Sequence, residues 1–473
     1  MLMSFFTSIS SIFFPNAVDA ARNPVDTSVE MAVENSIENT EEVEVPEGVP
    51  LLKHQTRHDK KPKTSEEIPI IDETKHNQAP AESKKFRLTW QVVPSAVKYQ
   101  VVILKEKYDT WENVVYAKDD CYTNGIEVDL SNFPDARNFY WKVCALNYET
   151  EPVAEFSELT PIADYEIVDS NAPMPTTQYD EMAYPPLFPV YSWIPVAIPT
   201  EDNPFGENAE FNEVEVVRID LEKNEVFYVR SIIGGEYDVY DEFSYNTAGN
   251  YFWRVRAVSE YGDALSDWSD FSAMRVTAPV KIAAFGDSIT HGGGAMTVPP
   301  GFLIYDWETY CDVPVKNLGH SGDTTAALLN RFDRDVLPFA PKVLIIMGGV
   351  NDFRETKISG WSSVQNLKAI KAKCDEHGII PIFLTPTPIN AELMKHYGFV
   401  ETPPSDWRVH QKYINDWILK QDYHIDVGSE LADSNGNLID TSDGLHPNME
   451  GKKIIGEMVQ DYLHEHFQNI VDS

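Results

Sequence analysis

The chain has 473 residues, enough for about three domains at roughly 150 residues each. Acidic residues outnumber basic ones by 75 to 38, and the formal charge of −37 disfavours a nucleic-acid binder, whose phosphate contacts need a basic face. The charge also disfavours attraction to anionic lipid, and no apolar stretch reaches the ~18 residues of a transmembrane segment. Four cysteines in so long a chain exclude a scaffold built on disulfides.

The N-terminal residues 1–20 have features of a signal peptide. An apolar run at residues 3–14 precedes Val18 and Ala20, which suit cleavage before Ala21, although no Lys or Arg precedes the run. Residues 21–85 are polar and contain no Phe, Trp or Tyr, so they offer too little apolar surface to offset chain entropy. We therefore expect a secreted or cell-surface protein with a disordered linker at residues 21–85.

Two stretches rich in β-branched and aromatic residues share one pattern. The first contains Trp90 and, 51 residues later, Trp141; the second contains Trp193 and, 60 residues later, Trp253. Strands are expected at residues 87–90, 97–103, 139–146, 191–193, 213–219 and 251–258. A recurrence on this scale predicts two related β domains.

Both copies resemble fibronectin type III modules, which are seven-stranded β-sandwiches. Trp90 and Trp193 match the family's core Trp, and Tyr251 begins its Tyr-x-x-x-Val-x-Ala pattern, whereas the first copy has Phe139 at that position. The resemblance implies modules at residues 86–165 and 186–278, each burying the inner faces of two sheets. We expect these modules to act as spacers; the alternative is contact with carbohydrate or a cell surface through exposed aromatic side chains.

Residues 279–473 alternate between short apolar strands and helical stretches. The expected strands are 280–285, 313–318, 343–347, 379–384 and 425–427, and the expected helices are 324–336, 362–377, 407–420 and 449–467. Near-continuous apolar strands separated by helices predict a parallel sheet covered on both faces. We therefore expect a three-layer α/β domain with five parallel strands.

Four polar clusters follow these strands, where open α/β sheets bind ligands. They are Gly286-Asp287-Ser288, Gly319-His320-Ser321-Gly322-Asp323, Gly348-Gly349-Val350-Asn351-Asp352 and Asp443-Gly444-Leu445-His446. Such residues suit acyl transfer, which needs a nucleophile, a base, a group that orients the base, and donors for an oxyanion. We predict Ser288 as nucleophile, His446 as base and Asp443 as its orienting carboxylate. The oxyanion donors would be the N–H groups of Ser288 and Gly322 and the amide of Asn351.

This constellation resembles the SGNH (GDSL-type) hydrolase family, which contains lipases, thioesterases and carbohydrate acetylesterases. The four blocks of the family occur in order over residues 280–466, with Ile289 as a small departure from the Leu of the family name. The resemblance implies a flavodoxin-like sheet and a serine ester hydrolase. No cofactor or metal is expected, because His464-Glu465-His466 lacks the spacing of a zinc motif.

Other residues near these blocks have competing interpretations. Ser321 is a rival nucleophile, Asp287 is expected to support the turn before Ser288, and His291 and His320 are expected to be substrate-side or structural. Cys121 and Cys144 share one β module, and whether they pair is left open.

The predicted substrate is a small-molecule or glycan ester. Residues 292–310, with Tyr305, Trp307 and Tyr310, and residues 386–406 are expected to form aromatic, proline-stiffened loops over the site. These features favour removal of short acyl groups, such as acetyl, from carbohydrate. The alternatives are a lipase or lysophospholipase and a surface adhesion protein with a vestigial hydrolase domain. We expect residues 278–473 alone to be as active as the whole chain.

Overall fold

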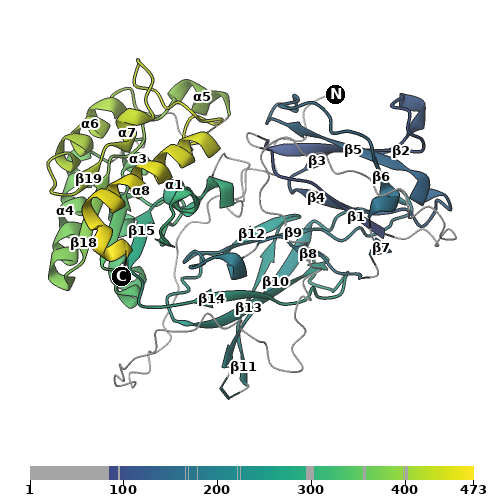
Figure 1. Ribbon diagram of the computed structural model, residues 1–473, viewed down its shortest axis with the longest axis horizontal. Coiled ribbons are helices and arrows are strands. Elements are labelled where there is room, and N and C mark those ends of the chain that lie inside the picture. The colour runs from purple at the N-terminus through teal and green to yellow at the C-terminus, as the bar shows by residue number, and fades with distance from the viewer. Residues whose placement is uncertain are drawn as a thin grey trace. The chain divides into compact units, whose positions relative to one another are not determined.

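The computed structural model describes residues 85–472 apart from residues 94–95, 166, 169, 178, 221, 224, 294–302, 355–357, 398 and 400–402. The predicted signal peptide and all but the last residue of the predicted linker lie outside the described residues. Three regions follow along the chain: a first β region, a second β region and an α/β domain (Figure 1). No helix in the described ranges is long and apolar enough to cross a membrane.

The first β region consists of two antiparallel sheets with a shared core. One sheet has the order β4-β1-β7 and the other β3-β2-β5-β6. The strands are β1 (Lys85–Thr89), β2 (Lys98–Leu104), β3 (Val114–Cys121), β4 (Gly125–Asp129), β5 (Tyr140–Leu146), β6 (Thr160–Pro161) and β7 (Ile167–Val168). Phe86 and Leu88 of one sheet and Val101 and Trp141 of the other belong to one buried cluster. Trp90 packs at the edge of this cluster and is only partly buried.

The second β region repeats the arrangement, with sheets β12-β9-β8 and β11-β10-β13-β14. Its strands are β8 (Met174–Pro175), β9 (Val190–Ile194), β10 (Phe211–Asp220), β11 (Glu225–Gly234), β12 (Asp238–Tyr240), β13 (Gly249–Val258) and β14 (Ser272–Val276). Trp193 and Trp253 are fully buried, and the hydroxyl of Tyr251 donates to the carbonyl of Thr247 at 3.0 Å. The strands expected from the sequence are present in both regions, while the fibronectin type III assignment stays a prediction.

The cysteines are all free thiols in the structure. Cys121 ends β3 and Cys144 lies in β5, and strand β2 separates these two strands in the sheet. The pairing that the sequence left open is therefore absent, and each of the two side chains is buried.

The α/β domain is built on five parallel strands in the order β16-β15-β17-β18-β19, which is the flavodoxin-like order. They are β15 (Ile282–Gly286), β16 (Lys316–Asn317), β17 (Val343–Met347), β18 (Ile380–Leu384) and β19 (His424–Ile425). The parallel five-stranded sheet predicted from the sequence is confirmed. Strand β16 is shorter than the predicted 313–318, because Pro314 has no N–H to donate to a sheet.

The strand order determines which face of the sheet each helix of this domain covers. They are α1 (Ser288–His291), α2 (Thr325–Asp335), α3 (Val350–Phe353), α4 (Gly360–His377), α5 (Ala391–His396), α6 (Trp407–Ile418), α7 (Val427–Glu430) and α8 (Met449–Val471). Right-handed crossovers put α2, α4 and α6 on one face, and α4 indeed packs against both α2 and α6. Helix α8 packs against the 3₁₀ turn Trp307–Tyr310 and crosses in front of the sheet in Figure 1.

A single hydrophobic core links the second β region to the α/β domain. Phe188 and Tyr191 belong to the same buried cluster as Phe285 of β15. Polar contacts reinforce this junction: the N–H of Leu187 donates to the carbonyl of Asn317 at 2.9 Å, and Nζ of buried Lys316 donates to the carbonyl of Pro185 at 2.5 Å. The second β region therefore packs directly against the α/β domain and is not merely joined to it by a linker.

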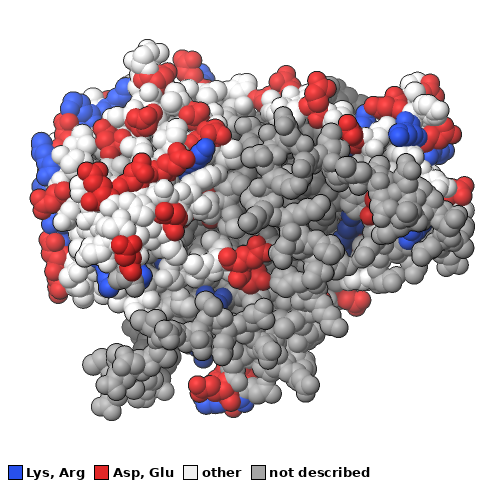
Figure 2. Space-filling view, viewed as in Figure 1, with Lys and Arg blue, Asp and Glu red and all other residues white. Residues whose placement is uncertain are grey.

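Lysine and arginine side chains lie scattered among acidic ones on the visible face of the α/β domain (Figure 2). The acidic side chains include a row on the outer face of α8, where Glu450, Glu457, Asp461 and Glu465 are all exposed.

Candidate active site

Ser288 stands at the first turn of α1, directly after β15. Asp287 caps this helix, and its Oδ1 accepts a hydrogen bond from the N–H of Ile289 at 3.0 Å. Gly286 precedes it in a space where a Cβ would lie 2.3 Å from Oγ1 of Thr290 and 2.6 Å from the carbonyl oxygen of Met347. Only glycine fits there. With glycine at this position the chain can turn sharply out of the sheet, which leaves Ser288 at the edge of the sheet.

Ser288, His446 and Asp443 form a continuous chain of contacts. Oγ of Ser288 lies 3.0 Å from Nε2 of His446, and Nδ1 of His446 lies 2.8 Å from Oδ2 of Asp443. Ser288 is 9 % exposed and Asp443 is 2 % exposed, so water has little access to the carboxylate. The structure thus brings together the three residues that the sequence predicted.

Asp443 is held by more than the imidazole. Its Oδ1 accepts hydrogen bonds from the N–H groups of Leu445 and His446, each at 2.8 Å. Burial raises the pKa of Asp443, but the charge of His446 and these hydrogen bonds outweigh burial and lower the pKa below its ordinary value. The side chain of Thr441, which the sequence analysis missed, donates to the carbonyl of His446 at 2.8 Å and completes the turn.

The predicted oxyanion donors lie on the ends of neighbouring strands. Among the described residues, neither the N–H of Ser288 nor that of Gly322 donates a hydrogen bond. Gly322 has φ +84°, and a Cβ there would meet no atom within 4 Å. Asn351 is buried, and its Nδ2 donates to the carbonyl of Asp323 at 2.9 Å, which leaves the second amide hydrogen for another acceptor.

Buried carboxylates fix these loops to the scaffold. Asp352 accepts hydrogen bonds from the N–H of Thr325 at 2.8 Å and from the hydroxyl of Ser363 at 2.8 Å, which joins the third block to α2 and α4. Asp323 pairs with Arg331, whose Nη2 also donates to the carbonyl of Gly286 at 3.0 Å. The sequence did not single out Thr325 or Arg331, since both belong to an amphipathic helix whose pattern suggests packing alone.

The rival nucleophile Ser321 has a different environment. Its Oγ lies 3.1 Å from Nδ1 of His291, and Nε2 of that imidazole lies 2.7 Å from the carbonyl oxygen of Phe188 instead of a carboxylate. Burial lowers the pKa of His291 to about 4, so this imidazole is a poor proton acceptor. Nδ1 of His320 lies 3.1 Å from Oδ1 of Asp323, and the His320 ring packs against the Phe188 ring with 4.6 Å between the centroids. His291 therefore has structural contacts.

The expected aromatic loops differ from the structure where it describes them. Tyr305 and Trp307 are 2 % and 0 % exposed, and Trp307 belongs to the main core. A Cβ on Gly456 of α8 would lie 2.3 Å from the carbonyl oxygen of Trp307, so helix and loop are in close contact. The expectation that Tyr305 and Trp307 belong to an aromatic loop over the site is wrong, because both side chains are buried. The segment 294–302 lies outside the described residues.

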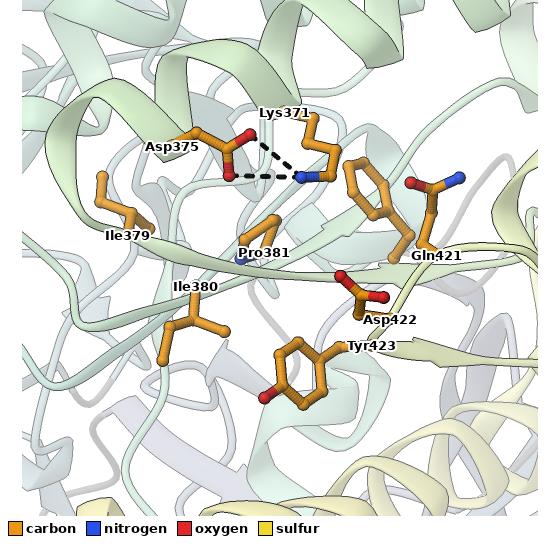
Figure 3. A pocket seen from close by; sticks show the side chains of 9 residues that line it. Lys371, Asp375, Ile379, Ile380, Pro381, Gln421, Asp422 and Tyr423 are labelled. Atoms are coloured by element: carbon orange, nitrogen blue, oxygen red, sulfur yellow. Dashed lines mark hydrogen bonds and ion pairs between the residues drawn. The ribbon is translucent and has the colours of Figure 1, made fainter.

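A small groove lies at the opposite end of the sheet from Ser288. It has a volume of about 180 Å³ and is lined by residues around the start of β18, including Ile380, Pro381 and Tyr423, with the Lys371–Asp375 ion pair on its rim (Figure 3). This volume is below the ~300–1,000 Å³ of typical ligand pockets, and the groove holds none of the predicted site residues. No group of three or more candidate metal ligands occurs in the described part of the chain.

Comparison with known proteins bears on the same region. Residues 284–454 match the model of the GDSL-like Lipase/Acylhydrolase family. The C-terminal domain is a GDSL-like lipase/acylhydrolase domain. The match spans all four polar blocks of this acylhydrolase domain and excludes both β regions.

Individual relatives cover about two fifths of this chain and most of their own length. The uncharacterized lipoprotein YqeF of Bacillus subtilis is 27% identical over 224 residues, which is 38% of this chain and 88% of that protein. The lipase/acylhydrolase from Enterococcus faecalis is 24% identical, covering 39% of this chain and 95% of its own, with a TM-score of 0.33. A GDSL-like lipase from Bacteroides thetaiotaomicron is 19% identical, covering 40% and 88%, with a TM-score of 0.32.

Proposed function

We propose that this protein is a secreted serine esterase that hydrolyses carboxylic esters, with Ser288, His446 and Asp443 as its catalytic triad. The observation that carries the proposal is the pair of contacts from Ser288 to His446 at 3.0 Å and from His446 to Asp443 at 2.8 Å. These are the distances at which a base can take a proton from a hydroxyl while a carboxylate fixes the tautomer of that base.

The first half of the proposed reaction acylates the enzyme. Oγ of Ser288 attacks the ester carbonyl while Nε2 of His446 takes its proton. Asp443 stabilises the imidazolium that forms. The carbonyl oxygen becomes an oxyanion, which accepts hydrogen bonds from the N–H groups of Ser288 and Gly322 and from the amide of Asn351. Collapse of this intermediate expels the alcohol, which takes the proton from His446.

The second half repeats these steps with water. His446 takes a proton from a water molecule, and the resulting hydroxide attacks the acyl carbon on Ser288. The same donors hold the oxyanion, and collapse releases the carboxylic acid as Oγ of Ser288 regains its proton. The ester supplies the acyl group and the alcohol, and one water molecule supplies the oxygen and proton that balance the second half.

For the substrate, we propose short acyl groups, such as acetyl, on carbohydrate. Gly293 borders the catalytic base: a Cβ there would lie 3.8 Å from the His446 ring and 3.9 Å from the carbonyl oxygen of Ser288. A glycine at this position offers a long acyl chain no apolar side chain to bury. The net charge of −37 also opposes approach to an anionic lipid surface, which favours an uncharged, soluble ester.

The test is the initial rate on p-nitrophenyl esters from acetate to palmitate, with Ser288→Ala as control. We expect the rate to fall steeply beyond acetate or butyrate and to vanish in the variant. A maximum at octanoate or longer would instead indicate a lipase or lysophospholipase. Substantial hydrolysis by Ser288→Ala would remove Ser288 as the nucleophile, and the absence of any Ser288-dependent rate on every ester would favour an adhesion protein.

A further inference from the structure

We propose that Tyr240, on β12 of the second β region, positions the loop 319–323 that carries Gly322, so that the second β region forms part of the active site. This inference rests on the proposed function, because it concerns an oxyanion donor of the same site. The second β region, which the sequence predicts to be a spacer, would then affect the rate of catalysis.

Tyr240 contacts this loop directly. The N–H of Ser321 donates to Oη of Tyr240 at 3.4 Å. The Tyr240 ring packs at a tilt against two imidazoles, with its centroid 4.6 Å from that of His291 and 5.8 Å from that of His320. One side chain of the second β region thus contacts the backbone of the loop, the His320 ring within the loop and the His291 ring of α1.

The side chain of Ser321 is tied to the same region through His291. The carbonyl of Phe188 can only accept, so Nε2 of His291 at 2.7 Å carries the hydrogen of that contact. Nδ1 is then the acceptor in the neutral ring, and the hydroxyl of Ser321 donates to it at 3.1 Å. Burial lowers the pKa of His291 to about 4, which keeps the ring neutral and this direction of donation in place.

Both hydrogen bonds of Ser321 therefore end on groups that the second β region holds. Gly322 follows immediately, with φ +84° and open space where a Cβ would lie. A glycine in open space has little packing of its own to fix its peptide planes. The N–H of Gly322 belongs to the peptide that begins at Ser321, so the fixing of Ser321 determines where that N–H points.

The test compares two tyrosines of the same region in the full-length protein. Tyr240→Phe removes the hydroxyl that meets the loop, and Tyr240→Ala also removes the ring. Tyr251→Phe is the matched control, because it removes a hydroxyl that donates to a backbone carbonyl at 3.0 Å within the β region itself. For each variant, kcat and KM on p-nitrophenyl acetate and the Tm are measured beside wild type and Ser288→Ala.

We expect Tyr240→Phe to lower kcat about 3- to 10-fold and Tyr240→Ala about 30-fold or more, with KM changed less than about 2-fold. Losing one oxyanion donor costs about 10²–10³ in kcat, and a displaced donor costs part of that. Tyr251→Phe should lower the Tm and leave kcat unchanged.

Three results would overturn the inference. In the first, kcat in both Tyr240 variants stays within about 2-fold of a Ser288-dependent wild-type rate. In the second, kcat falls equally in Tyr240→Phe and Tyr251→Phe, which indicates a structural role alone. In the third, wild type shows no Ser288-dependent hydrolysis, which overturns the proposed function and this inference with it. If Tyr240→Ala fails to fold, the comparison of the two Phe variants decides.

Discussion

Asp443 contacts His446 twice: its Oδ2 lies 2.8 Å from Nδ1 of the imidazole, and its Oδ1 accepts the backbone N–H of the same residue at 2.8 Å. The carboxylate therefore fixes both the ring and the peptide that carries it. An Asp three residues before a His at the start of a helix could serve merely as a cap, but this double contact ties the acid to the base.

We expect Asp443→Asn to lower kcat by about 10⁴ while the protein stays folded, because an amide in this position favours the wrong tautomer of the imidazole. Kinetics on p-nitrophenyl acetate measure the effect. Asp433→Asn is the matched control, since Asp433 also accepts backbone N–H groups in a turn but contacts no predicted site residue. A loss of less than about 10-fold in Asp443→Asn would remove Asp443 from the triad.

The conformation of Gly322 gives a second prediction. We expect Gly322→Ala to lower stability by about 1–2 kcal/mol, because φ +84° is strained for any residue with a Cβ, and to lower kcat 10-fold or more as its N–H shifts. Gly262→Ala is a control of equal strain, with φ +85° and equally open space. Urea unfolding and kcat of both variants test this, and an equal kcat in the two would exclude Gly322 as a donor.

The raised pKa of Asp287 leads to a third prediction, that the stability of the protein depends on pH. Burial raises the pKa of Asp287 to about 7 in the folded protein, so folding takes up a proton between about pH 4 and 7. The sign follows: this contribution is complete below about pH 4 and is lost as pH rises through about 7. Asp287→Asn keeps an oxygen to cap α1 but cannot ionise, so it lacks this loss.

The measurement is urea unfolding of wild type and Asp287→Asn at pH 5 and pH 8. We expect the unfolding free energy of the variant minus that of wild type to increase with pH by roughly 2–4 kcal/mol, at about 1.4 kcal/mol per pKa unit. Comparing the two proteins cancels the titration of every other group. A difference independent of pH would show that Asp287 is ionised throughout.

The junction between the second β region and the α/β domain leads to a fourth prediction, which reverses our expectation from the sequence. A fragment of residues 278–473 loses the contacts of Leu187 and Phe188, which are 0 % and 1 % exposed, at about 1.5–3 kcal/mol for each buried side chain. We expect this fragment to have a lower Tm and at least 10-fold lower activity than residues 171–473. Equal activity and Tm in the two fragments would contradict this.

The sequence predicted the sheet and the four blocks because both depend on local signals. Apolar runs fix β15, β17 and β18, and the Gly-rich blocks must follow strands that end at the same edge of the sheet. Ser288, Asp443 and His446 could therefore be named from order and spacing alone.

The rest depends on tertiary packing, which leaves no periodic signal. Nothing in the local sequence of Phe188 or Tyr240 indicates that they meet His291 and Ser321, more than 50 residues away. The sequence places the aromatic residues of 292–310 over the site, because composition cannot distinguish an exposed ring from a buried one. Trp307 is in fact core, where its large apolar surface is best accommodated.

The shared core of Phe188, Tyr191 and Phe285 has a consequence for genetics. In a library of random substitutions screened for loss of esterase activity, the inactivating positions should not be confined to the 284–454 segment that matches the family. They should extend upstream into residues 185–193 and 240, where they would be mistaken for changes in an accessory module. By this criterion the second β region and the acylhydrolase domain of this chain must be transplanted together as one unit.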